Sequence, residues 1–137
     1  MINLENLCRH FEVGNQVVRA LDEVDLVINK KEYVSIMGVS GSGKSTLLNI
    51  LGLLDTPTSG DYVLSGINTS KMNDDEMAHI RSTKIGFVFQ SFHLIPRLTA
   101  AENIEMPMVL SGLNPKERQE KVESALARVS LTDRSDH

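Results

Sequence analysis

The first part of the chain alternates apolar and polar positions with the period of two that half-buried strands show. Residues 2–8, 17–21 and 24–28 carry this pattern, and Gly14-Asn15 marks a turn within it. Glycine and asparagine favour tight turns because both tolerate backbone conformations that other residues avoid. Short strands joined by such turns predict a small antiparallel sheet at the N-terminus.

Two later stretches are almost continuously apolar, as strands that are buried on both faces of a sheet are. They are Tyr33 to Met37 and Ile85 to Phe89. Asp61 to Leu64 is a shorter strand candidate between two turn-rich segments. The pattern therefore predicts buried strands in addition to the N-terminal sheet.

Helical spacing of apolar residues and helix start signals together predict four helices. They cover 45–53 and 74–82 and begin again after Thr99 and after Asn114. Asn73 and Thr99 each have a glutamate three positions later, which is the pattern of a capping box, and Asn114 precedes a first-turn proline. Pro107 is expected to kink or end the third helix.

The composition is that of one soluble globular domain. Of the 137 residues, 41% are hydrophobic and 23% are charged. No apolar run approaches the roughly 18–20 residues of a membrane helix, and the N-terminus lacks the apolar core of a signal peptide. The net charge of −4, without a run of lysine and arginine, argues against a nucleic-acid partner.

Cys8 is the single cysteine, so it cannot form a disulfide within the chain. A reduced, cytosolic chain is the simplest interpretation. The histidines are scattered without the spacing of metal ligands, at positions His10, His79, His93 and His137. We therefore expect no metal or catalytic role for Cys8 and structural or exposed positions for the histidines.

The strongest chemical signal is the segment Gly38-Val39-Ser40-Gly41-Ser42-Gly43-Lys44-Ser45-Thr46. It matches the phosphate-binding pattern of Gly, any four residues, Gly, Lys and Ser or Thr. A strand candidate precedes the segment and a helix candidate follows it, which is the context that the pattern requires. The alternative is a glycine-serine turn that matches the pattern by accident.

The residue types of this segment suit a nucleoside triphosphate. Gly38, Gly41 and Gly43 can turn the chain so that successive backbone N–H groups surround an anion, since glycine reaches positive φ without a clash. The start of the helix adds free N–H groups and the positive end of its dipole. Lys44 can reach the β and γ phosphates, and the Ser45 hydroxyl can bind Mg²⁺. The predicted cofactor-binding residues of the loop are Gly38, Ser40, Gly41, Ser42, Gly43, Lys44, Ser45 and Thr46.

The sequence around the loop resembles the ATP-binding subunits of ABC transporters. Residues 35–52 and 54–60 are similar to the branch of that family that serves lipoprotein release and macrolide export, and so is 85–90. Phe92, Leu94, Ile95 and the segment 98–103 extend the resemblance, which runs over essentially all of the chain. It implies an α/β fold with a P-loop NTPase core, an N-terminal antiparallel β subdomain and the start of a helical subdomain. The implied domains are a nucleotide-binding core over 1–97 and the helical part over 98–137.

The resemblance also implies roles for two residues outside the loop. In this family an aromatic ring near the N-terminus, more usually tyrosine, stacks on the adenine of ATP, and Phe11 occupies the matching position. Gln90 stands where the family's glutamine contacts Mg²⁺ and the attacking water, so Ser45 and Gln90 are the expected metal ligands. The alternatives are a packing role for Phe11 and a surface-loop position for Gln90.

The partners that the resemblance implies are a membrane permease and a second ATP-binding subunit in a head-to-tail homodimer. Phe92 to Ile95 look like the groove that accepts a coupling helix of the permease, although an apolar run of this length is equally compatible with plain packing. The implied cofactors are ATP and Mg²⁺. The implied location is the cytoplasmic face of the cell membrane, as a peripheral subunit.

A complete ATPase of this family continues past His137, so we expect the chain to be its first half and a little more. The sequence lacks the signature motif, the second acidic motif with its Mg²⁺-organising Asp and water-polarising Glu, and the switch histidine. Phosphoryl transfer depends on positioned charges of this kind, so we expect negligible hydrolysis by these residues alone. Without the missing strands we also expect open apolar faces and a partly ordered, association-prone or rearranged structure.

Three functional hypotheses follow from these observations. The first is an ATPase module that powers a membrane permease. The second is a truncated nucleotide-binding or interaction fragment that does not hydrolyse ATP. The third is a P-loop ATPase without a link to transport, such as a DNA-repair ATPase, which the acidic balance and the match around Gln90 disfavour.

Overall fold

Two long strands, β1 (Ile2–Val13) and β2 (Gln16–Ile28), form an antiparallel hairpin in the computed structural model, which describes all residues 1–137. The turn between them contains Gly14 at φ 61°, a conformation that glycine adopts without strain. The predicted N-terminal antiparallel sheet is therefore confirmed. The structure joins 17–21 and 24–28 into one strand, although the sequence pattern suggested two.

The hairpin extends into a four-stranded sheet. β3 (Ser59–Leu64) pairs with β1, and β4 (Ile67–Asn68) pairs with β3, so the order is β2-β1-β3-β4 with antiparallel neighbours. The pairing of β1 with β2 shifts register between Leu4 and Leu7 and twice more before His10. Such bulges redirect side chains and increase the local twist of the strands.

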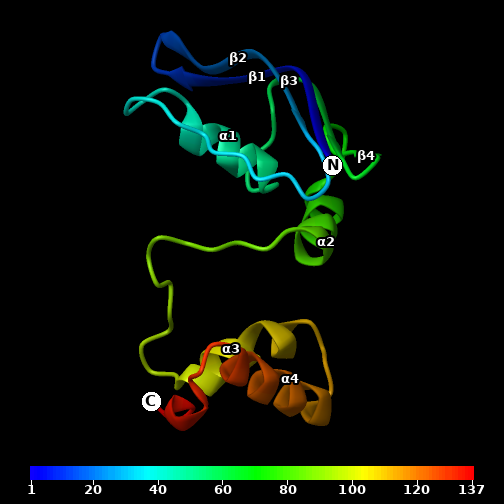
Figure 1. Ribbon diagram of the computed structural model, residues 1–137. Helices are drawn as coiled ribbons and strands as arrows, with labels where there is room; N and C mark the ends of the chain where they lie inside the picture. The colour runs from blue at the N-terminus through cyan, green and yellow to red at the C-terminus, as the bar shows by residue number, and fades with distance from the viewer. The chain divides into compact units, whose positions relative to one another are not determined.

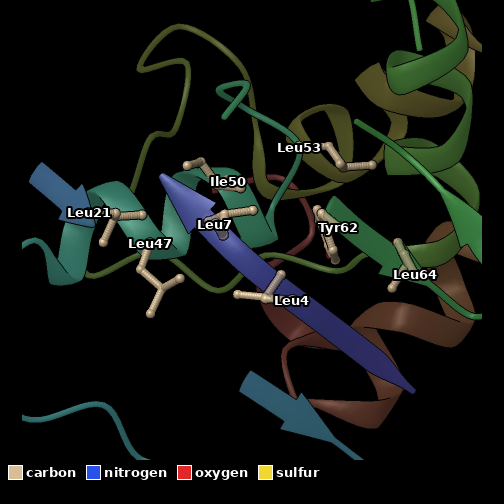
Figure 2. Close-up of a cluster of buried hydrophobic side chains, with 8 residues drawn as sticks. All are labelled: Leu4, Leu7, Leu21, Leu47, Ile50, Leu53, Tyr62 and Leu64. Carbon is tan, nitrogen blue, oxygen red and sulfur yellow. The ribbon is translucent and has the colours of Figure 1, made fainter. Parts of the chain in front are cut away.

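Helix α1 (Lys44–Leu51) lies along this sheet (Figure 1), and its buried residues Leu47 and Ile50 belong to the same apolar cluster as the sheet's core residues. The core contains eight buried side chains from β1, β2, β3, α1 and the residues next to them, which Figure 2 shows as one cluster. Tyr62 and Ile50 are fully buried, and the Tyr62 hydroxyl donates a hydrogen bond to the Leu51 carbonyl at 2.8 Å. The predicted helix over 45–53 is confirmed, and its packing fixes the loop that precedes it.

The two continuous apolar runs, 33–37 and 85–89, are not strands in the structure. The side chains of Tyr33 and Val88 are fully or almost fully exposed, at 94% and 101%. An extended segment becomes a strand only when a neighbouring strand satisfies its backbone N–H and C=O groups, and no segment of this chain pairs with either run. The sequence prediction of buried strands at these positions was therefore wrong for this chain.

Helix α2 (Asp74–Lys84) starts at the capping box that the sequence predicts. The Asn73 side chain accepts a hydrogen bond from the Glu76 amide, and the Glu76 carboxylate accepts one from the Asn73 amide, each at 3.0 Å. Acidic residues occupy the first turn and Arg81 and Lys84 the last, as the helix dipole favours. Arg81 also donates a hydrogen bond to the Leu53 carbonyl, which ties α2 to the end of α1.

Helices α3 (Ala100–Leu110) and α4 (Pro115–Arg128) form an antiparallel pair, followed by the short 3₁₀ helix η1 (Thr132–Arg134). Thr99 and Asn114 cap the two helices as predicted. α3 continues past Pro107 to Leu110, so the proline does not end the helix. Arg118 of α4 joins Glu105 of α3 in an ion pair at 2.7 Å. None of the helices is both long and apolar enough to cross a membrane.

Contacts divide the chain into two compact units, Met1–Phe87 and Val88–His137. The first holds the sheet with α1 and α2, and the second holds the α3–α4 pair. The functional boundary between 97 and 98, which the sequence resemblance implied, stays a prediction.

Candidate nucleotide-binding site

The loop from Gly38 to Gly43 turns sharply before α1. Gly41 and Gly43 have φ values of 80° and 85°, in the left-handed region that favours glycine. Gly38 has no such φ, but a Cβ at its position would lie 2.6 Å from the Ser42 hydroxyl oxygen. Two of the three glycines are therefore needed for their backbone conformation. Gly38 is needed because a side chain there would collide with Ser42 inside the loop.

The sheet holds the end of the loop in place through Gly43. A Cβ on this residue would lie 2.3 Å from the Ala20 carbonyl oxygen of β2, so only glycine fits against the strand. Gly43 is also the N-cap of α1, and no side chain caps the helix there. No acidic residue stands in the first turn of α1. The first N–H groups of the helix and the positive end of its dipole are therefore left for an anion.

The Lys44 side chain folds back over the loop. Its ammonium nitrogen donates hydrogen bonds to the Val39 carbonyl at 2.6 Å and to the Ser42 hydroxyl at 3.3 Å. A cation is thus held beside the glycine turn, where the charge of a phosphate would be neutralised. Ser40 and Ser45 are exposed, and Thr46 is half-buried. The predicted loop residues therefore come together in one segment at the start of α1.

Phe11 lies on β1 opposite Val18 of β2, and its ring is half-buried. The Arg9 guanidinium carbon is 4.5 Å from the ring centroid, within the range of a cation–π contact. Arg9 in turn donates hydrogen bonds to both carboxylate oxygens of Asp55, at 2.8 and 2.9 Å. One face of the predicted adenine platform is therefore covered by a fixed arginine.

Arg9 and Asp55 were not among the residues singled out from the sequence. One signal was present, since Arg9 stands two positions before Phe11, and residues at that spacing share a face of a strand. The partner Asp55 follows α1 in a loop and is distant in the sequence. Its contact with Arg9 depends on the packing of α1 against the sheet, which local patterns do not reveal.

Gln90 lies in the second unit, whereas Phe11 and the loop lie in the first. The residue is exposed and sits in an irregular segment after Phe89. Nearby, the rings of Phe89 and His93 meet edge to face with centroids 4.7 Å apart. Its role as a metal ligand therefore stays a prediction.

Comparison with known proteins decides which family this loop represents. The family model described as ABC transporter matches residues 21–137, which include the loop, α1 and Gln90. The chain belongs to the ABC transporter family. The resemblance that the sequence motifs carried is therefore confirmed.

Curated members of the ABC transporter family match over the whole chain. The chain is 52% identical over 137 residues to the ABC transporter ATP-binding protein YknY of Bacillus subtilis and covers 60% of that protein. It is 47% identical over 137 residues to the macrolide export ATP-binding/permease protein MacB of Burkholderia pseudomallei, of which it covers 21%. The sequence suggested a similarity to macrolide-export proteins, and this similarity is thus confirmed.

A solved ABC cassette has the same fold. The dimeric post-hydrolysis structure of the ATP-binding cassette MJ0796, bound to ADP and Pi, aligns with a TM-score of 0.87 at 43% identity. The alignment covers 100% of this chain and 61% of that one. The α/β fold of an ABC ATPase is therefore confirmed, and the chain spans about 60% of the length of YknY and of MJ0796.

Proposed function

We propose that this chain binds ATP with Mg²⁺ and forms part of an ATP-binding subunit that powers a membrane permease. The observation that carries the proposal is the geometry of the loop. The Lys44 ammonium is hydrogen-bonded to the loop, and the loop leads into a helix N-terminus that no side chain caps. A cation and free N–H groups at one place are what a polyphosphate needs. The family relationship supports adenine as the base.

The proposed roles within the site follow from the chemistry of each group. Backbone N–H groups of the glycine turn and of α1 would surround the phosphates, and Lys44 would exchange its bonds to Val39 and Ser42 for phosphate oxygens. The exposed Ser45 hydroxyl stands at the second position of α1 and offers the hard oxygen that Mg²⁺ prefers. The ion would neutralise phosphate charge when bound. We propose Gln90 as a further oxygen ligand on the basis of the family resemblance.

Phe11 is the proposed adenine platform. Because Arg9 lies over one face of the ring, the base would stack on the opposite face. The positively charged guanidinium is attracted to the partial negative charge of the aromatic face. The bidentate hydrogen bond to Asp55 keeps the guanidinium in this position. The ring is therefore held at a fixed position before any nucleotide arrives.

The proposed coupling to transport rests on the relatives. MacB of Burkholderia pseudomallei is described as an ATP-binding/permease protein, and MJ0796 forms a dimer in its solved structure. We infer a head-to-tail pair of subunits and a location on the cytoplasmic face of the membrane. Phe92 and Leu94 are exposed at 89% and 63%, which leaves apolar surface for a permease segment.

Nucleotide binding is tested with a fluorescent ATP analogue in the presence of Mg²⁺. Lys44→Ala should weaken binding by roughly 10–100-fold, because a hydrogen bond to a charged group contributes about 1.5–3 kcal/mol. Lys71→Ala is the matched control, since Lys71 is exposed in the same unit and lies outside the loop. Equal affinity of the Lys44 variant and the control would refute the site.

Phosphate release is measured on the same samples. The 137 residues contain no acidic motif of the kind that orients an attacking water in this family, so we expect binding without turnover. Phosphate release that disappears in Lys44→Ala would instead demonstrate that a general base lies within these residues. That result would overturn the expectation that these residues do not hydrolyse ATP, and it would leave the proposed nucleotide binding intact.

A further inference from the structure

A cluster of three different metal-binding side chains lies on the β1–β2 hairpin and includes no residue of the glycine loop. Cys8 and His10 come from β1 and Asp22 from β2, and one ligand atom of each lies within 4.8 Å of the others. Arg9 and His10 are consecutive in β1, but they pair with Leu21 and Arg19 of β2, so β2 has one extra residue at this point. This register shift brings the three side chains together. The sequence spacing of the histidines gave no sign of this arrangement.

The His10 ring nitrogen Nε2 is shielded from solvent and has no hydrogen-bond partner. A shielded polar atom without a partner is unusual, since desolvation costs about 1–3 kcal/mol when no hydrogen bond replaces the lost water. The atom faces the Asp22 carboxylate oxygen Oδ1 at 3.5 Å. This distance is too long for a hydrogen bond, and it leaves room for an atom that bonds to both.

The two oxygens of Asp22 have separate surroundings. Oδ2 accepts a hydrogen bond from Arg19 at 3.2 Å, and Oδ1 points to His10. The arginine therefore fixes the carboxylate while one oxygen stays available. Ligands of bound metals are commonly oriented by such a second contact.

The Cys8 sulfur is buried and already accepts a hydrogen bond. The Glu23 backbone N–H donates to it at 3.2 Å, and the thiol itself contacts the Asn6 carbonyl at 3.7 Å. These two contacts fix the position of the sulfur on the hairpin, as supporting contacts do for metal ligands. Glu23 and Asn6 adopt positive φ values of 51° and 47°, so the backbone bends sharply beside the sulfur.

We propose that Cys8, His10 and Asp22 bind one Zn²⁺ ion, with water as the fourth ligand. Zinc lies at about 2.0–2.1 Å from nitrogen and oxygen ligands, which in a tetrahedral site places those ligands roughly 3.4 Å apart. The observed 3.5 Å between His10 Nε2 and Asp22 Oδ1 fits this value. A tetrahedral site places the sulfur roughly 3.6 Å from the other two ligand atoms. Because the three ligand atoms lie within 4.8 Å of one another, each distance from the sulfur has to shorten by roughly 1.2 Å or less.

The donor set selects the class of metal. A thiolate and an imidazole favour zinc over Mg²⁺ or Ca²⁺, which take oxygen ligands. Binding releases the thiol proton of Cys8 to solvent, and the metal then forms one bond each to sulfur, nitrogen and oxygen. The site joins the two strands of the hairpin next to Phe11, and it depends on neither ATP nor the glycine loop.

The test uses Co²⁺ as a spectroscopic probe on the whole chain without an affinity tag. A thiolate bound to tetrahedral Co²⁺ gives a charge-transfer absorption, and an equimolar amount of Zn²⁺ should remove it because zinc binds such sites more tightly. We expect one Co²⁺ per chain and no competition from excess Mg²⁺. Cys8→Ser should abolish the absorption.

His10→Gln and Asp22→Asn decide whether the three residues act together. Loss of a residue that only orients a metal ligand weakens metal binding by roughly 10–100-fold. Loss of a ligand itself should weaken Co²⁺ binding by more than this, so we expect a larger effect in each variant. His79→Gln is the matched control, since His79 is exposed on α2 in the same unit, and it should change binding by less than about twofold. Asp22 is half-exposed, so its variant should fold even if Cys8→Ser does not.

Two results would overturn the proposal. Unchanged Co²⁺ affinity in His10→Gln and Asp22→Asn would mean that the sulfur alone binds the ion and that His10 and Asp22 form only an ion pair. A ratio of one Co²⁺ to two chains would mean that the metal bridges two cysteines instead of filling a site within one hairpin.

Discussion

The Arg9 guanidinium lies over the Phe11 ring at 4.5 Å and holds both carboxylate oxygens of Asp55. The side chains of Arg9 and Asp55 are only 23% and 24% exposed, so solvent weakens this ion pair less than it would an open surface pair. The arrangement fixes the ring and occupies one of its faces. A nucleotide base that stacks on Phe11, as we propose, would therefore have to approach the opposite face.

Replacing Phe11 should separate recognition of the base from recognition of the phosphates. We expect Phe11→Ala to weaken ATP binding by roughly 2–10-fold, because aromatic stacking contributes about 0.5–1.5 kcal/mol beyond buried area. Phe11→Tyr should bind ATP as the native chain does. Inorganic tripolyphosphate has no base to stack, so its affinity should be unaffected by either change, whereas Lys44→Ala should weaken both ligands. An equal loss of ATP and tripolyphosphate in Phe11→Ala would show that Phe11 only packs.

Gly43 should be the most sensitive glycine of the loop. In Gly43→Ala the new Cβ would meet the Ala20 carbonyl oxygen at 2.3 Å, in addition to the strain of φ 85°. Gly66→Ala is the matched control, since Gly66 has φ 86° and open space around it. The control should lose about 1–2 kcal/mol of stability from strain alone.

Urea unfolding measures both variants. Gly43→Ala should lose clearly more stability than Gly66→Ala and should also lose ATP binding, because the start of α1 must move away from β2. Similar unfolding midpoints for the two variants would mean that the loop shifts without cost and that β2 does not hold it in place.

Local signals in the sequence were sufficient for the helices. The capping pairs at Asn73, Thr99 and Asn114 act through hydrogen bonds to amides only three residues away, so the chain nearby contains everything that is needed to predict them. Pro107 was expected to kink or end the third helix, and the helix continues past it to Leu110. The proline ring removes one hydrogen bond, yet the turn beyond it continues, and Ser111 bonds back to the Pro107 carbonyl.

Local signals were not sufficient to predict which apolar runs form strands. An apolar run such as 33–37 has the composition of a buried strand, but a strand exists only beside a partner, and partners are set by contacts that are distant in the sequence. The glycine loop was predicted because it is one continuous motif. The Cys8–His10–Asp22 cluster was missed because the hairpin register and its bulges, not the spacing along the chain, bring the three residues together.

Asn103 should control the order of the segment that leads into α3. Its side-chain oxygen accepts a hydrogen bond from the Ile95 amide at 2.8 Å, and its nitrogen donates to the Leu98 and Thr99 carbonyls at 3.0 and 2.9 Å. We expect Asn103→Ala to cost about 2 kcal/mol, since two or three such bonds contribute about 0.5–1.5 kcal/mol each. Hydrogen exchange of the Ile95 amide is the direct measurement.

Thr99→Ala provides the comparison for this prediction. It removes only the helix cap and should cost about 1 kcal/mol. The Ile95 amide should exchange faster in Asn103→Ala and stay protected in Thr99→Ala. Equal protection in both variants would indicate that other contacts hold the segment.

Tyr62 should make the sheet unit sensitive to alkaline pH. Burial raises the pKa of the Tyr62 hydroxyl from 10.0 to about 12, because the phenolate would be charged in an apolar core. A group whose pKa is raised by folding stabilises the fold fully below its unfolded pKa and loses that contribution as the pH rises through the folded value. Stability should therefore fall between about pH 10 and pH 12.

Tyr62→Phe isolates this effect. At neutral pH the variant should be less stable by about 1 kcal/mol, since it loses the hydrogen bond to the Leu51 carbonyl. Above pH 10 the native chain should lose stability relative to the variant, so the difference between their free energies of unfolding should shrink and then change sign. Tyr33→Phe is the control, because Tyr33 is 94% exposed and its replacement should leave stability at neutral pH unchanged. If the difference between the native chain and Tyr62→Phe stays constant from pH 8 to pH 12, the phenol ionises without opposition from the core, and the packing around Tyr62 is looser than the structure indicates.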